Sequence, residues 1–136
     1  MQNTDCIILL KPHAITDIAR LNLIINKFNT NRVFITYNHI AVISYYCDYA
    51  LANYFSYALT DAWVNGIKTI EYTKYDKEVL IISNGESLEP KYIDSFINDN
   101  PQELIKELRN PYKKFIRKNS TKLHQDYRKL IETISK

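Results

Sequence analysis

Residues 5–12 read Asp-Cys-Ile-Ile-Leu-Leu-Lys-Pro, and the expected fold follows from this stretch. The apolar run is short, as in a buried strand, and proline ends it because proline cannot donate to a sheet ladder. We therefore predict a strand over 5–10. A helix is predicted over 16–28, because Thr16 or Asp17 can cap it and apolar residues then recur at helical spacing, at Ile18, Leu21, Ile25 and Phe28.

The same rules predict seven further segments along the chain. These are a strand over 33–43, a helix over 45–64 with one break allowed, a strand over 77–83, a short helix over 87–97, a helix over 101–108, a weak strand over 112–117 and a terminal helix over 125–134. Asn65-Gly66 is expected to stop the helix over 45–64. Asn100 and Pro101 form a typical helix start. This order is compatible with an α/β (α+β) fold, a ferredoxin-like split βαβ sandwich with additional helices and a four-stranded antiparallel sheet.

Length and composition favour one domain over residues 1–136. The formal net charge of +3 is unevenly distributed. Residues 1–105 hold eight Lys/Arg and twelve Asp/Glu, whereas residues 106–136 hold ten and three. A strongly basic last quarter suggests a phosphate-rich partner. Cys6 and Cys47 form no disulfide framework or zinc signature, and neither a signal peptide nor an apolar span is indicated, so we expect a cytoplasmic protein without a membrane partner.

Two residues stand out as candidates for phosphate chemistry. His124 lies within the basic quarter, where a neutral imidazole is a competent nucleophile and nearby cations stabilise a transferring phosphoryl group. Lys11 follows an apolar strand, and residues at strand ends of α/β domains point to the edge where ligands bind. The bland alternatives are a solvated basic face with an incidental histidine, and a lysine that merely reaches water.

The opening, Ile7 to Ile15, resembles that of the nucleoside diphosphate kinases, in which the first strand ends in a Lys-Pro pair. Later pieces follow the order of that family. The resemblance matches Tyr54 to a phosphate-contacting tyrosine, Arg109 after Asn100-Pro101 to a phosphate-binding arginine, and His124 to the phosphorylated histidine. Asn119 would match a further family asparagine after a small insertion. The histidine is followed by Gln125-Asp126 where the family usually has Gly-Ser, and the second phosphate arginine has no counterpart, so the chain resembles a diverged member.

The resemblance implies a ping-pong phosphotransferase. His124 would take the γ-phosphate of a nucleoside triphosphate carried with Mg²⁺ and pass it to a nucleoside diphosphate, and no metal site on the chain itself is implied. Lys11 and Arg109 would neutralise the moving charge, Tyr54 would hydrogen-bond the phosphates, and Glu132 or Asp126 would orient the imidazole. The resemblance also implies a homo-oligomer.

Two other functions stay open from the sequence. A diverged domain could bind a nucleotide or another phosphorylated ligand without transferring phosphate, or use His124 as a general acid or base. A small nucleic-acid-binding protein is the third alternative, because basic residues alternate with Tyr112, Phe115 and Tyr127 in the last quarter, and such segments bind single strands by charge and stacking.

Overall fold

The computed structural model describes residues 6–28, 30–53, 56–77 and 90–110. The chain divides into two compact units, residues 1–39 and residues 40–136. We call them the N-terminal and C-terminal units and describe each by itself. The single domain expected over residues 1–136 stays a prediction.

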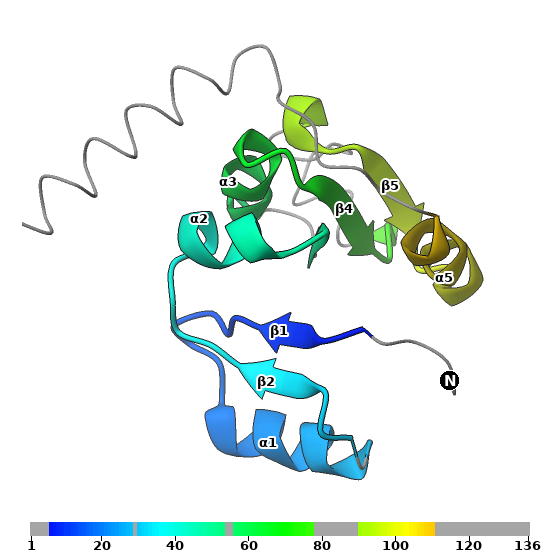
Figure 1. Cartoon of the computed structure of the whole chain (residues 1–136). Coiled ribbons are helices and arrows are strands. Elements are labelled where there is room, and N and C mark those ends of the chain that lie inside the picture. The colour runs from blue at the N-terminus through cyan, green and yellow to red at the C-terminus, as the bar shows by residue number, and fades with distance from the viewer. Residues whose placement is uncertain (1–5, 29, 54–55, 78–89, 111–136) are drawn as a thin grey trace, which may run out of the picture. The chain divides into compact units, whose positions relative to one another are not determined.

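The N-terminal unit is one strand–helix–strand motif (Figure 1). Strand β1 (Ile8–Leu10) leads into helix α1 (Ile18–Lys27), and strand β2 (Val33–Ile35) returns parallel to β1. Helix α1 begins where its cap predicts, because the Asp17 carboxylate accepts a hydrogen bond of 3.0 Å from the Arg20 amide. The strand that begins the fold and the helix after it are therefore confirmed, with shorter bounds than predicted.

Little of the N-terminal unit is buried. None of its described residues reaches full burial, and Leu9 and Phe34, which pair side by side in the parallel register, are 40% and 50% exposed. Ile18, Leu21 and Ile25 form the half-buried side of α1, as their spacing predicts, but Phe28 is exposed. The prediction that the first strand is buried is therefore wrong for β1, because two strands and one helix cannot enclose a core.

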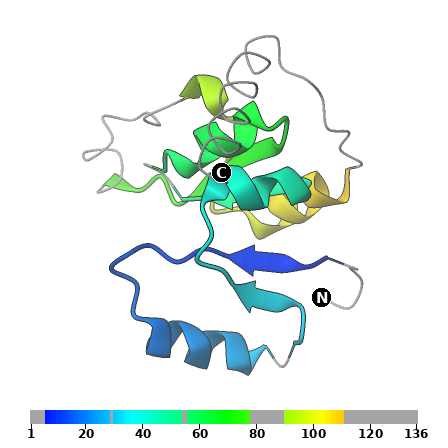
Figure 2. The ribbon, with the colours of Figure 1, turned by 60° about the vertical axis from the view of Figure 1, so that its left-hand side comes forward.

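The C-terminal unit is built on three parallel strands with β4 in the middle (Figures 1 and 2). Its elements are α2 (Ile40–Ile43), a 3₁₀ turn (Ser44–Tyr46), β3 (Tyr49–Ala52), α3 (Ala58–Val64), β4 (Lys68–Thr73), a second 3₁₀ turn (Pro90–Tyr92), β5 (Ser95–Asn98) and α5 (Pro101–Arg109). Strand β4 pairs with β3 on one side and β5 on the other, so both of its edges are hydrogen-bonded.

The core of this unit lies around β4. The apolar residues Leu59 and Ala62 of α3, Ile67, Ile70 of β4 and Ile97 of β5 are at most 2% exposed. The turn from α3 into β4 needs Gly66, which has a φ of 76°, a conformation that costs glycine little. The expected Asn65-Gly66 helix stop is thus confirmed, because α3 ends at Val64.

The predicted four-stranded antiparallel sheet is wrong. The described residues form a two-stranded and a three-stranded sheet, and every strand pair in them is parallel. The ferredoxin-like sandwich therefore does not describe this chain. Parallel pairing requires a crossover between successive strands, and helices α1 and α3 supply it between β1 and β2 and between β3 and β4.

Three predicted elements are wrong in part. The segment 33–43 is a strand only to Ile35, and residues 40–43 are helical. The helix expected over 45–64 begins only at Ala58, because residues 49–52 pair with β4 as a strand. Of the helix expected over 87–97, the described residues 90–97 contain only the turn at 90–92, and β5 starts at Ser95. In the last two cases, pairing with β4 outweighs the local preference for a helix. In the first case, pairing with β1 ends at Ile35, so the strand preference of the following residues does not extend β2.

Strand β4 lies in a stretch for which no element was predicted, and three predicted elements lie wholly or largely outside the described residues. Strand β4 falls in a stretch, Lys-Thr-Ile-Glu-Tyr-Thr, that is half polar and attracted no prediction. The helix over 101–108 is confirmed, with Asn100 as its cap and Pro101 as its first residue. The strand over 112–117 and the helix over 125–134 lie outside the described residues, as does nearly all of the strand over 77–83.

Candidate functional site

The carboxyl edge of the β3–β4–β5 sheet is the candidate site. In open parallel sheets, ligands bind in the crevice outside the carboxyl ends of the strands. The three strands end at Ala52, Thr73 and Asn98, and polar residues follow the last two strands directly. The side chains at this edge therefore decide what the unit can bind.

A buried carboxylate lies in the second half of the central strand, two residues before its carboxyl end. Glu71 is 1% exposed and sits in register between Ala52 of β3 and Phe96 of β5. The Tyr75 hydroxyl donates a hydrogen bond to its Oε1. Burial raises the pKa of Tyr75 above its ordinary value, and the hydrogen bond and negative charge of Glu71 raise it further. A buried carboxylate costs free energy unless it is hydrogen-bonded, so this pair marks a functional candidate.

A second tyrosine–carboxylate pair begins at the next residue of β4, on the opposite face of the sheet, because successive side chains of a strand alternate between faces. The Tyr72 hydroxyl donates to Oδ1 of Asp99 at 3.0 Å, and the pKa of Tyr72 is raised by desolvation and then by its hydrogen bond and the charge of Asp99. Asp99 has a φ of 41°, and its amide donates to the Thr73 carbonyl at 2.8 Å. Aspartate tolerates this left-handed backbone better than most residues. The loop after β5 is thus fastened to the end of β4.

The turn after β4 is also fixed to β5. The Tyr75 amide donates to Oδ1 of Asn98 at 3.1 Å, which ties the residue that holds Glu71 to the neighbouring strand. The exposed lysines Lys74 and Lys77 flank this turn and bring positive charge to the same edge. The edge therefore combines hydrogen-bond acceptors, tyrosine hydroxyls and two cations.

The first turn of α5 contributes less than its position suggests. Free amides at a helix N-terminus bind anions, but Oδ1 of Asn100 already accepts from the Gln102 and Glu103 amides, each at 3.2 Å. Among the described residues, no group of three or more His, Cys, Asp or Glu side chains could hold a metal ion.

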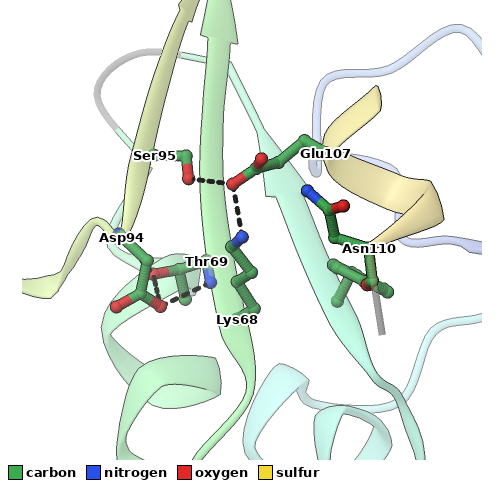
Figure 3. A network of polar contacts seen from close by, with 7 residues as sticks. Lys68, Thr69, Asp94, Ser95, Glu107 and Asn110 are labelled. Atoms are coloured by element: carbon green, nitrogen blue, oxygen red, sulfur yellow. Dashed lines mark hydrogen bonds and ion pairs between the residues drawn. The ribbon is translucent and has the colours of Figure 1, made fainter. Parts of the chain in front are cut away.

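A second polar network lies at the opposite, amino edge of the same sheet (Figure 3). Asp94 accepts from the Thr69 amide at 2.9 Å and from its hydroxyl at 3.1 Å, which locks the start of β4 to the start of β5. Glu107 of α5 forms an ion pair with Lys68 and accepts from the Ser95 hydroxyl at 2.6 Å.

These contacts at the amino edge are structural. The hydrogen bonds from Lys68 and Ser95 hold the pKa of Glu107 below its ordinary value. The Tyr49 hydroxyl donates to the Asn110 carbonyl, so all three strands are joined to the end of α5. The network fixes the helix against the sheet, and its groups are occupied by one another rather than directed at a ligand.

The structure places two of the predicted site residues. Lys11 is exposed and follows β1 directly, at the carboxyl end of that strand in the N-terminal unit. Arg109 is the exposed last residue of α5 in the C-terminal unit. Its helix turn is bonded to Lys68, so Arg109 lies at the amino edge, roughly 16 Å along β4 from the carboxyl edge at about 3.3 Å per residue.

The other predicted site residues lie outside the described part of the chain. They are Tyr54, Asn119, His124, Asp126 and Glu132. Conversely, Glu71, Tyr72, Tyr75 and Asp99 were missed by sequence reasoning. The available signal was the alternation of polar and apolar residues in 68–73, which is typical of a strand and would have placed Glu71 near a carboxyl end.

Comparison with known proteins adds no relative: no family model, curated protein or solved structure matches this chain. Within the described residues, no helix has the length and apolar character to cross a membrane. The function is therefore inferred from the side chains at the carboxyl edge of the β3–β4–β5 sheet.

Proposed function

We propose that the C-terminal unit binds a nucleotide, or another small phosphorylated ligand, at the carboxyl edge of its parallel sheet. The observation that carries this proposal is Glu71, a carboxylate buried in the central strand two residues before its carboxyl end and hydrogen-bonded by Tyr75, which follows that end. Burying such a group is costly, and this position in a parallel sheet is where ligands bind. A purely structural role would be served at lower cost by an apolar residue.

The edge offers complementary groups to the two halves of such a ligand. Carboxylates at this edge accept hydrogen bonds from ribose hydroxyls in dinucleotide-binding sheets, and the exposed Asp99 supplies such an acceptor. The buried Glu71 would act through Tyr75, whose hydroxyl it holds. Lys74 and Lys77 are the exposed cations that would neutralise phosphate oxygens. The carboxylates thus select hydroxyl groups while the lysines select the phosphates.

Titration calorimetry on the full chain tests this proposal, with ADP, GDP, ATP and ribose 5-phosphate as ligands and Mg²⁺ present. We expect saturable binding that weakens about tenfold or more in Glu71→Gln and severalfold in Lys74→Glu. Lys106→Glu makes the same charge change on an exposed residue of α5 and should leave affinity unchanged. Absence of binding by all four ligands, with circular dichroism showing a folded chain, contradicts the proposal.

A second candidate, phosphotransfer through His124, is favoured by the basic last quarter, where ten Lys/Arg accompany three Asp/Glu. Here Tyr54, Arg109 and Asn119 would contact phosphates, and Glu132 or Asp126 would orient the imidazole. Incubation with radiolabelled ATP should yield an acid-labile, alkali-stable phosphoprotein that His124→Ala abolishes. Nucleotide binding without any label would leave the binding function alone.

The remaining sequence-based proposals concern partners and location. We propose that the chain is cytoplasmic and that it forms a homo-oligomer. Size-exclusion chromatography with light scattering tests the oligomeric state. Binding to nucleic acid is the weaker alternative, and a gel shift at low salt that disappears steeply as salt rises would favour it. No shift with DNA or RNA at low salt excludes it.

A further inference from the structure

Helix α1 exposes large apolar side chains outside its half-buried side. Leu23 is 65% exposed, Ile24 44% and Phe28 70%, whereas Ile18, Leu21 and Ile25 are half-buried. Successive residues turn by about 100° around the helix axis, so Leu23 and Ile24 lie on one outward arc. Phe28, the C-cap of α1, borders that arc next to the half-buried Leu21. A helix that is apolar on both sides is typical of one that is covered on both sides.

The same outward arc is positively charged. Arg20 and Lys27 are exposed and project from it between Leu23 and Ile24. Residues 18–28 contain no Asp or Glu, and residues 6–39 hold four Lys/Arg against the single Asp17. Long basic side chains beside exposed apolar ones are the composition of helices that lie in the interface of a bilayer.

We propose that this outward side of α1, formed by Arg20, Leu23, Ile24, Lys27 and Phe28, docks on an anionic lipid surface. The apolar side chains would enter the boundary between headgroups and acyl chains, and the two cations would meet lipid phosphates. A second copy of the chain fits this side less well, because a two-fold contact would bring the same cations together. Docking of this kind needs no membrane-spanning helix and is independent of the proposed ligand site.

Vesicle co-sedimentation of the full chain tests the proposal, with phosphatidylcholine alone and with phosphatidylcholine mixed with phosphatidylglycerol. We expect binding to the mixed vesicles only. Each basic residue near a lipid surface contributes about fivefold in affinity, so Arg20→Gln with Lys27→Gln should weaken binding by about 25-fold. Leu23→Ser with Phe28→Ser should weaken it at least as much, because it removes most of the exposed apolar surface of the arc.

Matched controls separate α1 from the rest of the basic chain. Lys106→Gln and Tyr46→Ser change a charge and a 79% exposed aromatic in the C-terminal unit, and should leave binding nearly unchanged. Should the serine variant unfold, Leu23→Trp gives a second measurement, since its fluorescence should shift to the blue only with anionic vesicles.

Three results would overturn the proposal. They are no binding to mixed vesicles at low salt, binding that persists in both α1 double variants and so arises from other basic residues, and a concentration-dependent dimer that those variants abolish. The last result would assign the surface to a second copy of the chain. Binding to an acidic protein without binding to vesicles would equally exclude lipid.

Discussion

The two units repeat one local motif with different outcomes. In the N-terminal unit a strand, a helix and a parallel strand leave Leu9 and Phe34 half exposed. In the C-terminal unit the same motif gains a third strand, and Ile70 of its middle strand is fully buried. A two-stranded sheet is at best marginally stable, whereas a third strand encloses the middle one on both edges. Burial is therefore a property of the completed sheet and not of the repeated motif.

The largest expected difference between the units comes from truncating matched apolar residues. Ile70→Ala should lower the free energy of unfolding by about 2–5 kcal/mol, because it removes a buried side chain and leaves a cavity. Leu9→Ala, at a half-exposed site, should cost about 1 kcal/mol or less. Urea unfolding followed by Trp63 fluorescence and by circular dichroism measures both values. Equal costs would mean that the exposure of Leu9 does not describe the chain in solution.

Two hydrogen bonds to backbone amides sharpen the comparison. In the C-terminal unit the Asp94 carboxylate accepts a hydrogen bond from the amide of the buried Thr69 at 2.9 Å. In the N-terminal unit the Thr30 hydroxyl accepts one from the amide of the exposed Arg32 at 3.3 Å. Asp94→Ala should cost about 1–3 kcal/mol, because the Thr69 amide loses its side-chain acceptor away from water. Thr30→Ala should cost only a few tenths, since water replaces the hydroxyl at an exposed amide. Thermal unfolding of the two variants provides the measurement, and a reversed order would refute the assignment of burial.

Helix caps should cost about the same in either unit. Asp17→Ala removes the cap of α1 and Asn100→Ala the cap of α5, and each should lower stability by about 1 kcal/mol. Asp17→Asn and Asn100→Asp keep a capping oxygen and serve as controls. A cap is a local interaction, so a cost several times larger at Asn100 would show that this residue also supports the carboxyl edge.

The effect expected at Glu107 is no larger than that of a helix cap, and it depends on pH. The pKa of this carboxyl is lower in the folded chain than its ordinary value of 4.5. The ionised group therefore stabilises the fold fully above the unfolded pKa, and this contribution is lost as the pH falls through the folded pKa.

Glu107→Gln tests that contribution by chemical unfolding at pH 7 and at pH 3. The substitution should cost up to about 1 kcal/mol at pH 7, as for partly exposed ion pairs, and the difference from the parent chain should shrink towards pH 3. Glu103→Gln, on the exposed first turn of the same helix, is the matched control with a smaller expected effect. A difference that stays constant with pH would assign the cost to packing rather than to charge.

The parts of the fold that sequence reasoning predicted are those fixed within a few residues. The end of β1 at Lys11-Pro12, the α1 cap at Asp17, the stop at Asn65-Gly66 and the start of α5 at Asn100 are each set by one side chain or one backbone preference. Such signals act over one turn of chain, so they are readable without knowing what packs against them.

The candidate site was not predictable by the same means. Its residues lie in the second half of β4 and directly after β4 and β5. Strand β4 is itself recognisable only through its pairing with β3 and β5. Ala50 pairs with Thr69, 19 residues later in the chain, and Ile70 pairs with Ser95, 25 residues later. The alanine-rich segment 49–52 favours a helix locally, and strand pairing overrides that preference.

The sequence by itself determined where the helices α1 and α5 begin, where the first strand ends and how charge is distributed along the chain, because these depend on neighbouring residues alone. The tertiary structure decided that the strands are parallel, that none of the described residues of the N-terminal unit is fully buried, and that Glu71 is buried in the central strand near its carboxyl end. Those features depend on contacts between distant segments, whose free energy no single stretch of sequence contains.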